Sequence, residues 1–180
     1  MIRIIGGEAK GRKLKSPRGQ EIRPTLGRIR QVLFDLLQRE VRETSFLDLF
    51  AGTGIVALEA LSRGASRAAL VEKKGSMVRI IRENVSLLGY QDRVRIFQGD
   101  AMRIAEKLAP LGPFGIIFAD PPYTFQDYEK LVSLYLPLLD KGGTLAIQHL
   151  KAFSLALPPG FSIKERKVGE HLLTLVTGEE

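Results

Sequence analysis

Hydrophobic and polar residues change their spacing along this chain of 180 residues. Between residues 45 and 148, short apolar runs alternate with segments whose apolar residues recur every three to four positions. The first pattern is typical of buried strands and the second of amphipathic helices. The patterns predict strands at 45–50, 68–72, 93–98, 114–119 and 143–148, and helices at 53–63, 75–89, 101–109 and 126–138. This alternation predicts a mostly parallel, doubly wound α/β sheet of Rossmann-like type.

The two ends of the chain follow other patterns. Residues 1–24 predict a small basic β extension, and residues 25–180 the main domain. A helix is predicted over 24–41, with Pro24 at its start. Alternation over 161–168 and 172–176, on either side of Gly169, predicts a C-terminal antiparallel hairpin.

Positive charge gathers in the first quarter of the chain. Residues 1–45 contain 11 Lys/Arg and 5 Asp/Glu, whereas the remainder is nearly balanced. Such asymmetry indicates a polyanionic partner. Residues 8–24 lack the pattern of a membrane-binding helix, so nucleic acid is favoured over an anionic membrane. The residues predicted to bind RNA are Arg12, Lys13, Lys15, Arg18, Arg23, Arg28 and Arg30.

The composition excludes several kinds of chemistry. The absence of cysteine excludes disulfides, thiolate metal sites and cysteine nucleophiles. The two histidines, His149 and His171, lack metal-ligand spacing, and we expect no metal. No apolar run reaches the roughly 18 residues of a membrane span, and no signal peptide precedes the basic segment. We expect a cytoplasmic monomer that does not associate with membranes.

A glycine-containing turn follows the first predicted strand of the sheet. Ala51-Gly52-Thr53-Gly54 allows a sharp turn and a close approach to a ligand. Ala57 stands at the third glycine position of a dinucleotide motif, and no Walker sequence follows, so a pyrophosphate ligand is disfavoured. Asp48 on the preceding strand would repel phosphates and attract a cation, such as an α-amino group or a sulfonium.

Acidic residues also end the next strands. Glu72 suits the two hydroxyls of a ribose, and Asp100 an adenine amine, although each could instead cap a helix. Four acids at the carboxyl edge of the sheet match a ligand with a ribose, an adenine and a cationic amino-acid end. This ligand is S-adenosylmethionine, with S-adenosylhomocysteine as the product. The residues predicted to bind it are Asp48, Phe50, Ala51, Gly52, Thr53, Gly54, Glu72, Lys73, Asp100, Ala101 and Asp120.

Asp120-Pro121-Pro122-Tyr123 is the most informative segment. It follows the apolar strand 114–119, and two prolines end that strand because they cannot donate ladder hydrogen bonds. The loop offers a carboxylate, free backbone carbonyls and an aromatic face. These groups suit a planar base held by its exocyclic amine and stacked on a ring, although an ordinary acidic turn has the same composition. The predicted catalytic residues are Asp120, Pro121, Pro122 and Tyr123.

These motifs together resemble a known family. The segments at 48–54, 72, 100 and 120–123 are similar to those of class I amino-methyltransferases. The N-terminal segments at 3–7, 11–14 and 23–30 resemble the RsmD family of bacterial 16S ribosomal RNA (guanine-N2)-methyltransferases. The resemblance implies methylation of one guanine amine in 16S RNA, on the 30S subunit or a late assembly particle. Gly27 and Gln148-His149 depart from the pattern, because acids are expected at both places, and Asp120 remains the acid that would hold the base.

Other functions stay open on the sequence alone. DNA adenine-N6 and protein glutamine methyltransferases use related loops, more often with Asn in place of Asp120. A Rossmann oxidoreductase would use Glu72 with NAD, but it would leave residues 120–123 without a role. A non-catalytic RNA-binding ribosome factor would explain the basic N-terminus and leave the acidic crevice unexplained.

Overall fold

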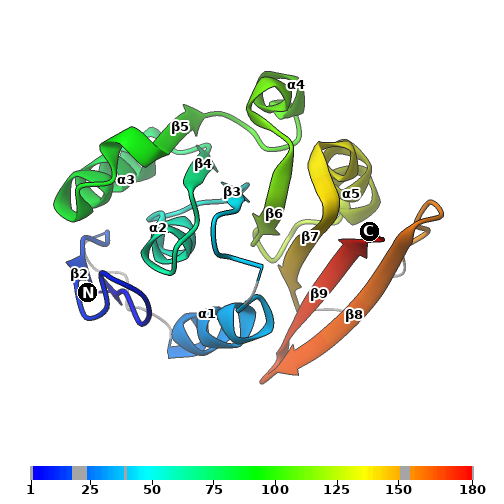
Figure 1. Cartoon of the computed structure of the whole chain (residues 1–180), viewed down its shortest axis with the longest axis horizontal. Helices are drawn as coiled ribbons and strands as arrows, with labels where there is room; N and C mark the ends of the chain where they lie inside the picture. The colour runs from blue at the N-terminus through cyan, green and yellow to red at the C-terminus, as the bar shows by residue number, and fades with distance from the viewer. Residues whose placement is uncertain (1, 18–23, 39, 151–154, 180) are drawn as a thin grey trace.

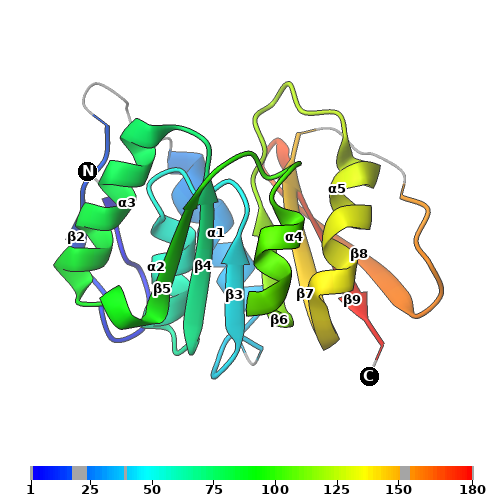
Figure 2. The same cartoon turned by 90° about the horizontal axis from the view of Figure 1, so that it is seen from above.

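The computed structural model describes residues 2–17, 24–38, 40–150 and 155–179, which form a seven-stranded sheet with helices on both faces (Figures 1 and 2). The strand order is β5-β4-β3-β6-β7-β9-β8. The strands are β3 (Ser45–Asp48), β4 (Arg67–Glu72), β5 (Val94–Gln98), β6 (Phe114–Ala119), β7 (Leu139–His149), β8 (Phe161–Val168) and β9 (His171–Gly178). The first five are parallel, whereas β9 runs antiparallel to both β7 and β8. The predicted mostly parallel sheet with a C-terminal hairpin is therefore confirmed.

Two apolar layers hold the helices against the sheet. The helices are α1 (Pro24–Leu36), α2 (Ile55–Ser62), α3 (Gly75–Leu88), α4 (Ala105–Leu108) and α5 (Tyr128–Tyr135). One buried cluster joins α1, α2 and α3 to one face of the sheet, and a second joins α4 and α5 to the other face (Figure 1). The parallel strands are buried on both faces, which explains their continuous apolar runs. No helix in the described ranges combines the length and the apolar character of a membrane span.

The N-terminal extension packs against the helices. β1 (Ile2–Arg3) pairs antiparallel with β2 (Lys13–Leu14), as the alternation predicts. Ile2, Ile4 and Leu14 are buried in the same cluster as α1 and α2. Gly7, at φ 79°, lies against the end of α2, where a Cβ would come within 1.8 Å of the Ser62 carbonyl oxygen. This close approach requires glycine.

Three predicted elements, α1, α4 and β7, differ most clearly from the observed ones in length. α1 ends at Leu36, and the chain continues in turns; Leu37 and Val41 remain buried, which explains why the apolar spacing continued to residue 41. α4 begins only at Ala105, because 101–103 form a turn in which the Arg103 N–H donates to the Asp100 carbonyl at 2.9 Å. β7 begins at Leu139, before a register shift opposite β6. Shorter differences affect β3, α2 and α5, whose last turn continues as a 3-10 helix containing Pro137.

Candidate functional site

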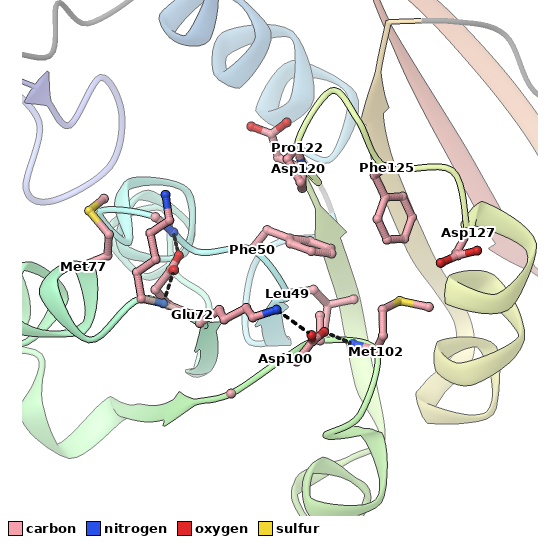
Figure 3. Close-up of a pocket in the computed structure, with 15 residues that line it drawn as sticks. Leu49, Phe50, Glu72, Met77, Asp100, Met102, Asp120, Pro122, Phe125 and Asp127 are labelled. Atoms are coloured by element: carbon pink, nitrogen blue, oxygen red, sulfur yellow. Dashed lines mark hydrogen bonds and ion pairs between the residues drawn. The ribbon is translucent and has the colours of Figure 1, made fainter.

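A pocket of about 610 Å³ opens at the carboxyl edge of the parallel strands (Figure 3). This edge is where open α/β sheets bind ligands. The residues that line the pocket are Leu49, Phe50, Gly52, Glu72, Lys73, Lys74, Met77, Gly99, Asp100, Ala101, Met102, Asp120, Pro122, Phe125 and Asp127. Most of them lie at or just after the ends of β3, β4, β5 and β6. The volume lies within the range of about 300–1,000 Å³ that small-molecule sites occupy.

Glu72 at the end of β4 holds the turn after β3. Its Oε2 accepts the Gly52 N–H at 2.9 Å, and its Oε1 accepts the Lys74 N–H at 2.8 Å (Figure 3). A carboxylate offers about four acceptor positions, so two remain for a ligand. Glu72 is therefore both a brace for the turn and an acceptor that lines the pocket.

Asp100 at the end of β5 is also partly engaged. Its Oδ1 accepts the Met102 N–H at 2.9 Å, and its Oδ2 pairs with Lys73 Nζ at 3.0 Å (Figure 3). The Met102 hydrogen bond and then Lys73 hold the pKa of the Asp100 carboxyl below its ordinary value. The alternative role of Asp100 as a capping residue thus involves only one of its carboxylate oxygens, and the carboxylate still lines the pocket. Ala101 contributes its buried backbone to the same wall.

Asp48 lies behind the pocket wall rather than on it. Its side chain is 1% exposed, and neither carboxylate oxygen has a hydrogen-bond partner of good geometry among the described residues. Burial, and then the negative charge of Asp120, raise the pKa of Asp48 to about 8. A buried carboxyl without a cation is costly in its charged form. Asp48 is therefore a group that a bound cation would stabilise.

The Asp120-Pro121-Pro122-Tyr123 loop stands where β6 ends. Burial raises the pKa of Asp120 to about 7. Asp120 and Pro122 line the pocket, whereas Pro121 is buried beside them. Tyr123 is 52% exposed, and its ring centroid lies 6.1 Å from that of His171. The loop thus presents a desolvated carboxyl group and an accessible aromatic ring.

Apolar residues that the sequence did not single out complete the pocket. Leu49, Met77, Met102 and Phe125 line it together with Phe50, which was predicted. The Phe50 and Phe125 rings meet edge to face, with their centroids 5.8 Å apart. Phe125 follows the double proline by three residues, a proximity that could have identified it. Met77 and Met102 carry no sequence signal that separates them from core residues.

The predicted cofactor residues divide into two groups. Phe50, Gly52, Glu72, Lys73, Asp100, Ala101 and Asp120 line the pocket. Asp48, Ala51, Thr53 and Gly54 lie behind the wall or in the turn. Gly54, at φ 79°, comes directly before α2, where a Cβ would lie 3.1 Å from Leu70. The glycine lets the turn pack on β4. Among the described residues, no cluster of three or more His, Asp or Glu side chains could hold a metal ion.

The basic residues occupy different environments. Lys13 and Arg28 are exposed. Arg12 is exposed and donates to the Leu87 carbonyl, and Lys15 pairs with Glu83 at 2.8 Å on the surface. Arg18 and Arg23 lie outside the described residues.

Arg30 corrects the sequence prediction. It is 5% exposed, pairs with Glu59 at 2.7 Å through Nε, and donates to the Arg3 carbonyl at 2.7 Å. Glu59, itself fully buried, also pairs with Arg63 at 2.8 Å. Arg30 therefore ties α1 to the N-terminal segment and to α2, and it is not exposed to RNA. Arg30 follows Ile29 in a helix whose apolar residues recur at helical spacing. This position in the helix is the sequence signal that could have predicted the burial of Arg30.

The strand order, with its reversed C-terminal hairpin, defines the class I methyltransferase fold. The O-methyltransferase from Bacillus cereus, solved in complex with SAH, superposes with a TM-score of 0.72 over 89% of this chain and 84% of that chain. The two sequences are 17% identical, so this likeness concerns the fold alone.

A family model described as Conserved hypothetical protein 95 matches residues 2–177, and the chain belongs to this family. The Ribosomal RNA small subunit methyltransferase D of Escherichia coli (strain K12) is 37% identical over 150 residues, which cover 83% of this chain and 72% of that protein. A solved hypothetical protein of Thermus thermophilus is 36% identical, covers 100% of both chains and has a TM-score of 0.80. The resemblance predicted from the sequence is thereby confirmed.

Proposed function

We propose that this protein transfers a methyl group from S-adenosylmethionine to the exocyclic N2 of one guanine in 16S ribosomal RNA. The observation that carries the proposal is the Asp120-Pro121-Pro122 loop, which stands at the edge of a pocket that also contains Glu72 and Asp100. The name of the Escherichia coli relative supports a small-subunit RNA as the substrate.

The pocket residues fit the methyl donor. Glu72 has acceptor positions left for ribose hydroxyls, and Asp100 offers a carboxylate to the adenine amine. Phe50, Phe125 and Met102 supply apolar surface for the adenine ring. The buried Asp48 carboxyl, whose oxygens have no hydrogen bond of good geometry among the described residues, would supply the charge that a cationic amino-acid end requires. When bound, the donor supplies a methyl group activated by a positively charged sulfur.

Asp120 and Pro121 would hold the attacking amine. Guanine N2 is a weak nucleophile because its lone pair is delocalised into the ring. The Asp120 carboxylate and the Pro121 carbonyl each accept one N–H, which favours a tetrahedral nitrogen with its lone pair toward the methyl group. As the N–C bond forms and the S–C electron pair returns to sulfur, these acceptors stabilise the positive charge that develops on nitrogen. The proton then leaves the nitrogen for Asp120 or for water.

Tyr123 would hold the base, and the basic surface would hold the RNA. The exposed ring offers a stacking face worth about 1–3 kcal/mol per base. The phosphates of the RNA would be neutralised by basic residues of the predicted set: Arg12, Lys13, Lys15, Arg18, Arg23 and Arg28. A single 180-residue chain has room for only a small RNA contact, so a folded loop on the 30S subunit or a late assembly particle is the proposed substrate. We place the protein in the cytoplasm as a monomer, with residues 1–24 as its basic extension.

Methylation of isolated substrates tests the proposal. Unmethylated 30S subunits and naked 16S RNA are incubated with protein and labelled S-adenosylmethionine, and the nucleosides are identified by mass spectrometry. We expect N2-methylguanosine, formed faster on 30S subunits, and none with Asp120→Ala. Asp92→Ala is the control, because this exposed acid is not among the residues that line the pocket. N6-methyladenosine as the product, or an active Asp120→Ala variant, would overturn the proposal.

A further inference from the structure

A buried amide oxygen without a partner lies near the end of β7. The Gln148 side chain is 4% exposed, and its Oε1 has no hydrogen-bond partner among the residues that the structure describes. Its Nε2 donates to His171 Nδ1 at 3.3 Å, which holds the amide in one orientation. An unpaired buried carbonyl is destabilising. The oxygen therefore lacks a partner that the described residues could supply.

Strand register pairs the residues that directly precede Asp120 and Gln148. β6 and β7 pair in parallel with Ala119 opposite Ile147. Asp120 directly follows the end of β6, and Gln148 directly follows Ile147 within β7. Neighbouring strands lie about 4.8 Å apart. Side chains at paired positions project to the same face of a sheet. Continued by one residue, this register would put the Gln148 side chain and the carboxylate proposed to hold the guanine amine on the same face of the sheet.

The aromatic ring of Tyr123 belongs to the same group. Its centroid lies 6.1 Å from that of His171, at an interplanar angle of 49°. His171 therefore contacts both the Gln148 amide and the Tyr123 ring. It comes from the start of β9, which places it at the carboxyl edge of β7. The C-terminal hairpin thus supplies the support for a polar group beside the base-holding loop.

We propose, as an extension of the proposed function, that Gln148 Oε1 accepts the ring N1–H of the target guanine and selects guanine over adenine. In both purines the exocyclic amine adjoins ring N1. Guanine N1 carries a hydrogen, whereas adenine N1 carries a lone pair. When Asp120 holds the exocyclic amine, guanine donates its N1–H to Gln148 Oε1. Adenine held by its amine would place the N1 lone pair opposite the same oxygen, so that two acceptors would face each other. A site built to pair with a polar group rejects a base that leaves it unpaired.

Gln148→Met separates this role from a structural one, because methionine keeps the length and removes the amide. We expect kcat/KM on unmethylated 30S subunits to fall about tenfold, the size of one lost hydrogen bond. The affinity for S-adenosylmethionine should stay within about twofold. Gln148→Glu, which keeps an acceptor at the same reach, should retain most of the activity.

Thr144→Val is the matched control. Thr144 is buried in the middle of the same strand, where its Oγ1 lies 3.1 Å from Thr177 Oγ1. We expect this variant to lose thermal stability and keep its activity, and Gln148→Met to keep its Tm and lose activity. Wild-type kcat/KM in Gln148→Met would overturn the inference. A fall in activity matched by equal losses of Tm and cofactor affinity would also overturn it, since that result marks a structural role.

A binding measurement tests the inference separately from the proposed function. Calorimetry on the protein saturated with S-adenosylhomocysteine compares guanosine and adenosine monophosphates. We expect the wild type to prefer the guanosine nucleotide, and Gln148→Met to lose that preference. 1-Methylguanosine monophosphate, which lacks the N1 hydrogen, should bind as the adenosine nucleotide does. Equal binding of the two nucleotides by the wild type would overturn the role of Gln148, whereas absence of N2-methylguanosine on 30S and 16S RNA would overturn the proposed function.

Discussion

Asn84 on α3 bonds both to the N-terminal segment and to the turn after β3. Its Oδ1 accepts the Lys15 N–H at 2.7 Å, and its Nδ2 donates to the Lys15 and Thr53 carbonyls at 3.1 and 3.0 Å. The side chain is completely buried. One amide therefore fixes the basic segment relative to the turn that carries Gly52 in the pocket wall.

Asn84→Ala should destabilise the protein and weaken cofactor binding together. The substitution leaves the Lys15 N–H and two carbonyls without their partner, and we expect the free energy of unfolding to fall by about 2–3 kcal/mol. Chemical denaturation and calorimetry with S-adenosylmethionine measure the two effects. Glu83→Ala is the control, because it removes only the exposed ion pair to Lys15, worth less than about 1 kcal/mol. Equal losses in the two variants would show that Asn84 does not brace the turn.

Asp48→Asn should stabilise the protein increasingly as the pH rises. Burial raises the pKa of Asp48 from 3.8 to about 8, so between these values the folded protein keeps a proton that the unfolded chain has lost. The wild type therefore loses stability across this window, and the variant, which does not titrate there, does not. Thermal unfolding at pH 5, 6.5 and 8 without cofactor should give a Tm difference that grows with pH. The exposed residue Asp92, changed to Asn, should give no such trend.

Binding of S-adenosylmethionine near pH 7 should release protons from the Asp48 carboxyl group. A cation beside Asp48 favours its charged form and lowers its pKa from about 8. Calorimetry in phosphate and in Tris, whose ionisation enthalpies differ, gives the number of protons released. Asp48→Asn should abolish most of the release and weaken binding. Buffer-independent heats for the wild type would remove Asp48 from the cation site.

Glu72→Ala should weaken S-adenosylmethionine binding by about 1.5–3 kcal/mol, as for hydrogen bonds to a charged group. The change removes the proposed ribose acceptor and also the acceptor for the Gly52 and Lys74 N–H groups. Glu106→Ala, an exposed acid on α4, serves as the control. An unchanged dissociation constant in Glu72→Ala would exclude Glu72 from the cofactor site.

Replacing Arg12, Lys13 and Lys15 together by Ala should weaken binding to 30S subunits and flatten its salt dependence. Each side chain that no longer neutralises a phosphate lowers the slope of log affinity against log salt by about 1. S-adenosylmethionine affinity should be unaffected. A triple change of Lys107, Lys130 and Lys141 removes the same charge from exposed positions elsewhere on the protein. If both triple variants lose affinity equally, net charge and not the N-terminal surface drives docking.

The element pattern could be predicted because it depends on local chemistry. Strands buried on both faces need continuous apolar runs, and β6 shows one over Phe114–Ala119. Errors arose where buried side chains extended beyond the hydrogen-bonded element. Leu37 and Val41 face the core from turns after α1. After Asp100, the predicted start of α4 is instead a turn, in which the Arg103 N–H donates to the Asp100 carbonyl.

By itself, the sequence determined the order of the elements and placed Glu72, Asp100 and Asp120 at strand ends, because parallel strands bring their carboxyl ends to one edge. Only the tertiary structure decided which polar side chains are desolvated and which remain accessible. Arg30 is a basic residue in a basic segment, yet it lies in the interior against Glu59. Gln148 acquires its place one residue beyond the Ala119–Ile147 pair from strand pairing, and its Oε1 has no partner among the described residues. Burial and pairing depend on residues distant in the chain, and so no local pattern encodes them.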